Sequence, residues 1–366
     1  MTVERIAEIL KASGAYGWEI SDTKLTGREF YFIKHSLDQA RAKDVRHITL
    51  KVYGLSEDGS SMGSASADVP PSASEEELAK TVSDLIYQAS LVKNKPYELN
   101  PARPVEPMPE CAADPDGEAR RFIEAMASVR ETESEDLNSY EIFANFAERR
   151  FVNSRGVDVT ERFPSSMVEA VVNARRDGHE IELYRLYELG ACDAETLRRD
   201  IEETMAFGKD RLIAVPTPPL GSCAAVFSTD AALQIYEYFI GNLDAAYVVR
   251  GMSAFETGKP VAQDIEGDRV SVFARRVLPG SPANFSCDAE GAPVRDLCLM
   301  EDSVPRHWCG SRMFTQYLGL DDAFSLTNWE VKGGSRPAAE LRKGDFLEVV
   351  EFSDFQVDDM TGDIFG

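Results

Sequence analysis

The residues from about 138 to 189 constrain the fold of this chain more than any other stretch. They read as successive strand-like segments, NSYEIFANFAERRFV, VDVTERF, SSMVEAVVNARR and EIELYRLYEL, which are joined by the short turns NSRG and RDGH. Both turns place a glycine where the backbone needs a positive φ. Strands joined by such tight turns pair antiparallel, because a parallel pair needs a long crossover connection. The stretch therefore predicts an antiparallel sheet.

The segments that precede this stretch mix helices with strands. Apolar residues recur at helical spacing over residues 3–12, whereas WEIS at 18–21 and a segment around 30–33 are typical of strands. Apolar and polar residues alternate in HITLKVYGL, which predicts the first arm of a hairpin that turns at Asp58–Gly59. This mixture favours an α+β architecture.

Two signals mark where a helix begins and where the chain becomes irregular. Ser74 and Glu77 have the spacing of a capping box, which predicts the start of a helix. Residues 94–109 hold five prolines, so this segment can neither stay helical nor lie inside a sheet. We expect a surface connection there, followed by helices over about 118–129 and 194–205.

A second region of different character follows these helices. The RLIAVP segment at 211–216 reads as a strand, and CAAVF at 223–227 reads as a short buried strand. Residues 229–243 predict a helix that either Ser228 or Thr229 caps. Segments farther along, such as DRVSVFARRV and GDFLEVVEFSDFQVD, predict mainly strands and loops.

The pattern as a whole predicts an α+β fold in two domains. The N-terminal domain, residues 1–208, combines the antiparallel sheet with helices and contains the proline-rich connection 94–109. The C-terminal domain, residues 209–366, is rich in β-strands around one central helix at 229–243. The chain has no GxGxxG motif, no P-loop and no internal repeat.

Charge and composition exclude several functional classes. The net charge is −24, from 39 Lys and Arg against 63 Asp and Glu, which disfavours binding to a nucleic-acid backbone. The six cysteines form no CxxC pair and the four histidines lie far apart, so we expect reduced cysteines and no histidine-rich metal site. The N-terminus is charged and no run of about 18 apolar residues occurs. We therefore expect a cytoplasmic protein that does not span a membrane.

The stretch IYEYFIGNLD, residues 235–244, lies in the expected central helix and holds the candidate site. At about 100° per residue, the apolar side chains cover an arc of roughly 160°, and Glu237 lies at its edge. The expected core-facing residues are Ala232, Leu233, Ile235, Tyr236, Phe239, Ile240 and Leu243. The expected opposite side carries Gln234, Tyr238, Gly241 and Asn242.

A zinc protease would need more than Glu237. Two imidazoles must hold the ion while a neighbouring glutamate takes a proton from the bound water. Tyr236 is a poor zinc ligand in this role, and Gly241 has no side chain. We therefore expect no catalytic residue, no metal ligand and no cofactor in this chain.

Several motifs together resemble the TldD/PmbA family, whose PmbA branch is also called TldE and is often described as a modulator of DNA gyrase. The resemblance runs over nearly the whole chain and depends on the order and spacing of the motifs. The motifs are WEIS, ITLKVYGL, MGSASAD, FVNSRGVDVTER, VVRGMSAFETGKPV, LTNWEVKGGSRPAAEL and FQVDDMTGDIFG.

The resemblance implies a role for the central helix. TldD-type members are zinc proteases with an HExxxH helix and a later cysteine ligand. On that pattern Tyr236 and Gly241 stand where the two histidines would be, and Glu237 stands at the glutamate. The chain ends at Gly366, directly after TGD, where family members usually continue, so we expect a shortened C-terminus without the cysteine. The resemblance thus implies a vestigial metal helix of the PmbA/TldE kind.

The resemblance also implies a function. It suggests a non-catalytic subunit that pairs with a TldD-type zinc peptidase, with itself or with both, and handles peptides in proteolysis or peptide maturation. One alternative is a stand-alone hydrolase whose nucleophile is Cys223, or Cys309 beside His307. Another is a regulator of a DNA enzyme such as gyrase, which at −24 could imitate nucleic acid but not bind it.

Overall fold

The computed structural model describes residues 1–358 and 360–366 and divides into two units. The N-terminal unit comprises Met1–Pro96, Pro101–Pro216 and Val277–Ser286. The C-terminal unit comprises Tyr97–Asn100, Thr217–Arg276 and Cys287–Gly366. Each unit has hydrophobic clusters of its own. Helices and strands occur in both units, so the predicted α+β class is confirmed.

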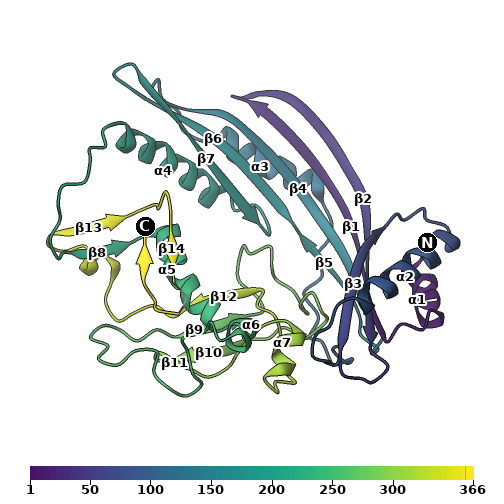
Figure 1. Ribbon diagram of the computed structural model, residues 1–366. Coiled ribbons are helices and arrows are strands. Elements are labelled where there is room, and N and C mark those ends of the chain that lie inside the picture. Colours follow the sequence, from purple (N-terminus) through teal and green to yellow (C-terminus); the bar gives the residue numbers. More distant parts are fainter. Residues whose placement is uncertain (359) are drawn as a thin grey trace. The chain divides into compact units, whose positions relative to one another are not determined.

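An antiparallel sheet of seven strands forms the framework of the N-terminal unit (Figure 1). Its order is β3-β2-β1-β4-β6-β7, and β5 pairs with β4 beside this path. Turns at Gly156 and Gly178, with φ of 88° and 78°, join β4 to β5 and β6 to β7. The antiparallel sheet predicted from these turns is therefore confirmed. The strands are β1 (Gly17–Ile33), β2 (Ser36–Leu55), β3 (Met62–Val69), β4 (Glu135–Asn153), β5 (Asp158–Pro164), β6 (Ser166–Arg176) and β7 (His179–Leu189).

The first hairpin of this sheet is much longer than the sequence predicts. β1 and β2 pair from Gly17 opposite Tyr53 to Ile33 opposite Ser36. The two short strands expected at 18–21 and 30–33 are therefore one strand. The first part of β2 gave no signal because residues 36–42 are all exposed, so their polarity does not alternate.

Helices cover the apolar parts of this sheet. They are α1 (Val3–Ala12), α2 (Glu75–Ser90), α3 (Pro115–Ala127) and α4 (Ala194–Leu212). The predicted capping box is confirmed, since the Glu77 amide donates to Ser74 Oγ and the Ser74 amide donates to the Glu77 carboxylate. The strand predicted for RLIAVP is wrong, because α4 continues to Leu212 and residues 213–216 form no strand.

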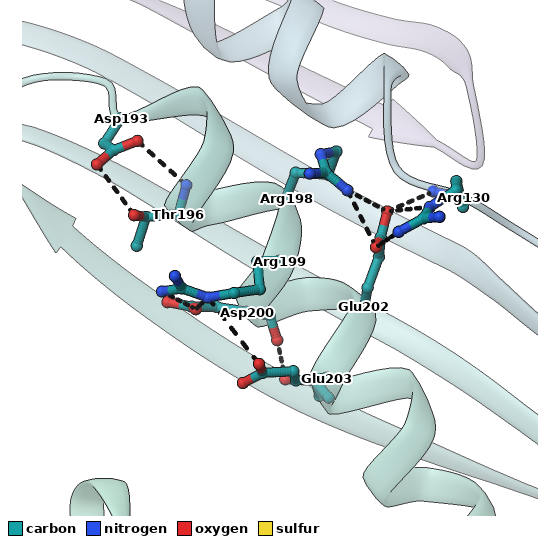
Figure 2. A network of polar contacts seen from close by, with 9 residues as sticks. Arg130, Asp193, Thr196, Arg198, Arg199, Asp200, Glu202 and Glu203 are labelled. Atoms are coloured by element: carbon teal, nitrogen blue, oxygen red, sulfur yellow. Dashed lines mark hydrogen bonds and ion pairs between the residues drawn. The ribbon is translucent and has the colours of Figure 1, made fainter.

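Charged side chains fasten α4 to the residues that follow α3 (Figure 2). The Glu202 carboxylate accepts hydrogen bonds from the Arg130 guanidinium at 2.8 Å and from Arg198, one turn earlier, at 3.0 Å. These donors, Arg130 first, lower the pKa of Glu202 to about 2. At the start of the helix, Asp193 accepts from the amide of Thr196 at 3.1 Å. The network therefore fixes both the beginning and the middle of α4.

The C-terminal unit is built from shorter elements. Its main sheet has the order β11-β10-β9-β12, while β8 pairs in parallel with β13 and β14 pairs with β15. The strand predicted at CAAVF exists as β8, but it lies in a two-stranded sheet and is largely exposed, so its predicted burial is wrong. The elements are β8 (Ala224–Phe227), α5 (Thr229–Asn242), α6 (Ala245–Arg250), β9 (Val272–Arg275), β10 (Leu297–Glu301), β11 (Val304–Pro305), α7 (Arg312–Tyr317), β12 (Asn328–Val331), α8 (Ala338–Leu341), β13 (Phe346–Val349), β14 (Gln356–Val357) and β15 (Ile364–Phe365). Within residues 1–358 and 360–366, no helix is long and apolar enough to cross a membrane.

Candidate functional site on helix α5

Helix α5 carries the three positions singled out in the sequence, and its ends are built differently. Ser228 is the N-cap residue, but its side chain makes no capping hydrogen bond. The helix ends at Asn242, and α6 begins almost at once. The Asp244 carboxylate caps α6 by accepting from the Ala246 amide at 2.7 Å. The C-terminal end of α5 is therefore more strongly fixed than its beginning.

The apolar pattern predicts the buried side of α5 only in part: Leu243 is buried, and Phe239 and Ile240 pack against the hydrophobic cluster of the unit, as expected. Asn242, expected on the solvent side, is completely buried, and Leu233, expected in the core, is 49% exposed. The Tyr238 ring, also expected on the solvent side, makes an edge contact with Phe255 at 5.7 Å between centroids. The prediction failed at Asn242 and Tyr238 because it counted both as polar, although both are used inside the unit.

Asn242 is buried because its amide satisfies main-chain groups. Its side-chain nitrogen donates to the Tyr238 carbonyl at 3.0 Å, and its side-chain oxygen accepts from the Ala254 amide at 2.7 Å. Its own carbonyl accepts from the Ser253 hydroxyl at 2.8 Å. A buried polar group without partners costs about 1–3 kcal/mol, so these bonds hold the segment after α6 against the end of α5.

The three candidate positions form no metal site. Glu237 is exposed, and its carboxylate has no hydrogen bond or ion pair with any residue that the structure describes. The Tyr236 ring lies against the Phe239 ring at 6.2 Å between centroids, and Gly241 contributes only its main chain. Among the described residues, no three His, Cys, Asp or Glu side chains are grouped so that they could hold a metal ion. The chemistry that remains at this position is one solvated carboxylate.

The cysteine–histidine pair considered from the sequence is not formed. The Cys309 thiol is buried and donates to the Leu243 carbonyl at 3.6 Å, and its burial raises the pKa of the thiol. His307 is exposed, and its Nδ1 lies 2.8 Å from the Cys298 carbonyl. A nucleophilic cysteine needs an accessible thiolate beside a base. Cys309 has neither, so the hydrolase interpretation based on it is wrong.

Cys223, the other candidate nucleophile, lies in the segment between α4 and β8 and is exposed. Its side chain makes no hydrogen bond with the described residues, so no base is placed to deprotonate it. The sequence missed the residue that organises this region, Asn242. The one sequence signal for the role of Asn242 is its position, since it is an asparagine at the last residue of a mainly apolar helix.

Comparison with known proteins shows what this chain is similar to. Residues 220–366 match the model of the PmbA/TldA metallopeptidase C-terminal domain. The structure of TldE from Thermococcus kodakarensis superposes with a TM-score of 0.76 at 13% identity, covering 98% of this chain and 85% of that chain. No curated protein sequence matches the chain.

Two further solved structures have the same fold. A protein named as a candidate modulator of a DNA gyrase from Thermotoga maritima superposes with a TM-score of 0.73 at 17% identity, covering 99% of this chain and 86% of that chain. A protein of the same description from Bacteroides thetaiotaomicron gives 0.76 at 13% identity, covering 99% and 84%. At these identities the likeness shows the fold.

Proposed function

We propose that the chain is a member of the metallopeptidase-related TldD/PmbA family, because residues 220–366 match the model of the C-terminal domain, and that it is a non-catalytic subunit of a TldD-type zinc peptidase. Its partner supplies the zinc site, and the complex acts in proteolysis or peptide maturation in the cytoplasm. The chain completes the complex through contact with the catalytic subunit, with a second copy of itself or with both.

The main support for this proposal comes from Tyr236 and Gly241, which stand where a zinc peptidase of this family would have its two histidines. Peptide hydrolysis by zinc needs side chains that hold the ion and a glutamate that takes a proton from the bound water. Tyr236 and Gly241 offer no imidazole, so Glu237 has no metal-bound water to act on. A carboxylate that is exposed and without partners is also poorly placed as a general base, because nothing orients it.

The exposed side of α5 is the contact surface that we propose. Leu233 and Tyr236 follow one another at helical spacing; Leu233 is 49% exposed and Tyr236 is partly exposed, whereas Ile240 packs against the hydrophobic cluster of the unit. An aliphatic and an aromatic side chain in one row are typical of residues that become buried on binding. This row is therefore proposed to contact the catalytic subunit or the peptide that it holds.

Size-exclusion chromatography with light scattering tests the proposal. We expect the chain to form a complex with a TldD-type subunit at micromolar concentration, and we expect L233D to weaken the complex at least about tenfold. The matched control is L341D, at a leucine in α8 that is 43% exposed and lies outside this row. Two proteins that elute separately at all concentrations would contradict the proposal, and equal weakening by both variants would remove α5 from the contact.

A further inference from the structure

A pocket of about 580 Å³ in the C-terminal unit belongs to none of the features described above. Arg295, Arg306 and His307 provide its positively charged or ionisable side chains, and Leu297, Trp308 and Leu318 provide apolar walls. These residues come from β10 and the segment just before it, from the segment after β11 and from the residue that follows α7. We call this site the arginine–tryptophan pocket.

The two arginines keep unused donors although each has an acidic neighbour. A guanidinium has five N–H groups. Arg306 uses one of them, in a hydrogen bond to Glu301 at 3.2 Å. Arg295 donates to the main-chain oxygen of Asp322 at 2.7 Å, pairs with the Asp322 carboxylate at 3.0 Å and lies over the Phe324 ring at 5.1 Å. Arg295 is therefore held in place, whereas the exposed Arg306 keeps most of its N–H groups for a ligand.

His307 is also oriented by the main chain. A carbonyl oxygen can only accept, so Nδ1 donates to the Cys298 carbonyl at 2.8 Å and the neutral ring leaves Nε2 as an acceptor. The amides of Arg306 and His307 both donate to the Leu299 carbonyl, at 2.8 and 3.1 Å. The segment that carries two of the polar side chains and Trp308 is thus held against β10. A ligand would find these side chains already in place.

The charges and the apolar walls together select a ligand class. Asp321 and Asp322 also line the pocket, and they disfavour a doubly charged anion such as a phosphate monoester. A single carboxylate meets about half of this repulsion and can still take charge-assisted hydrogen bonds from the guanidinium donors. Trp308, Leu297 and Leu318 offer burial to an apolar group attached to it.

We propose that the arginine–tryptophan pocket binds a carboxylate carried by an apolar group, of the kind found at the C-terminal residue of a peptide. The inference goes beyond the proposed function, because it requires neither a partner subunit nor peptide cleavage. It assigns a role to Arg306 and Trp308, which the helix α5 site does not use.

Isothermal titration calorimetry of the full chain with N-acetyl-phenylalanine and its amide tests the proposal. We expect the acid to bind and the amide to bind at least about tenfold more weakly, because the amide cannot take charge-assisted hydrogen bonds. R306Q should weaken binding of the acid about tenfold. R342Q is the control, because Arg342 also pairs with one glutamate, at 2.7 Å, and is exposed to a similar extent, 39% against 45% for Arg306.

Tryptophan fluorescence tests whether the acid binds in the arginine–tryptophan pocket. We expect the acid to change the emission of the protein and W308F to abolish that change, since neither Trp18 nor Trp329 lines the pocket. A tripeptide ending in phenylalanine that binds more tightly than the acetylated residue would identify a peptide as the source of the carboxylate, and equal binding would identify a small acid. Equal binding of acid and amide, no effect of R306Q, or no binding of the acid would each overturn the proposal.

Discussion

The two units of this chain are held together in different ways. In the N-terminal unit, fully buried apolar side chains such as Phe122, Leu50 and Ile142 join helices to long strands. The C-terminal unit has one apolar cluster built on short elements, and there buried polar side chains also bind the main chain of irregular segments, as Asn242 does for Ala254. Regular elements satisfy their own main-chain groups, whereas irregular segments need side chains for this. Each unit should therefore be sensitive to a different kind of substitution.

The largest effect is expected from F122A in α3. Phe122 is completely buried in the cluster between α3, α4 and the sheet, so its removal leaves a cavity and should lower the free energy of unfolding by about 3–5 kcal/mol. Urea denaturation followed by circular dichroism measures the change. Y87A is the control, because Tyr87 is 67% exposed and its loss should cost less than about 0.5 kcal/mol. Similar losses for both variants would contradict a core built on apolar burial.

A smaller but more local effect is expected from N242A. The substitution leaves the Ala254 amide and the Tyr238 carbonyl without their buried partner, which should cost about 2–3 kcal/mol. Hydrogen exchange should show loss of protection around Ala254. The matched control is N138A, because the Asn138 side chain donates to Glu182 at an exposed position of the sheet. Unchanged protection at Ala254 in N242A would show that apolar packing alone holds this segment.

The pH dependence of the C-terminal unit should come partly from Asp288, with an effect comparable to that of N242A, because each unit of pKa shift corresponds to about 1.4 kcal/mol. Burial raises the pKa of Asp288 from 3.8 to about 6, although its carboxylate accepts from the amides of Glu290, Ala292 and Ser325. A carboxyl whose pKa is higher in the folded state favours folding when protonated. Its contribution is therefore lost as the pH rises from about 4 to about 6.

This dependence can be measured as the difference in thermal midpoint between the protein and D288N. The difference removes the general effect of the net charge, which both proteins share. We expect the protein to lose stability relative to D288N as the pH rises through this range. A difference that stays constant between pH 4 and 7 would show that Asp288 titrates at its ordinary value.

The smallest effect is expected from S74A at the start of α2. The Ser74 hydroxyl accepts from the Glu77 amide at 3.2 Å at an exposed helix end, so its loss should cost about 1 kcal/mol. The change in urea midpoint measures this cost, with S72A as a control for a serine outside the capping box. A loss as large as that of N242A would remove the distinction between helix caps and buried polar side chains.

Much of the N-terminal unit could be predicted because its signals are local. The capping box at Ser74 and the turns at Gly156 and Gly178 depend on residues adjacent in sequence, and all three are found. The first part of β2 could not be predicted, because only its pairing with β1 makes it a strand. The end of α4 could not be predicted either. The helix continues to Leu212, into a segment whose apolar residues are also typical of a strand.

Less of the candidate site than of the N-terminal unit could be predicted, because its contacts join residues that are distant in sequence. The sequence identified positions 236, 237 and 241 of the helix, and it placed Leu243, Phe239 and Ile240 correctly toward the core, but it missed the burial of Asn242 and the exposure of Leu233. Burial of Asn242 depends on the Ala254 amide twelve residues later, and no periodic pattern reports such a contact. The arginine–tryptophan pocket could not be predicted either, since β10 and the residue that follows α7 come together only in the folded unit.

The proposed non-catalytic role can be tested by measuring hydrolysis of an unfolded peptide by a TldD-type subunit, titrated with this chain in the presence of zinc. We expect no cleavage by this chain alone and a rise in cleavage that saturates at a fixed ratio of the two proteins. Cleavage by this chain alone, abolished by a chelator and by E237Q, would contradict this role, because Glu237 would then act at a metal site that Tyr236 and Gly241 do not form.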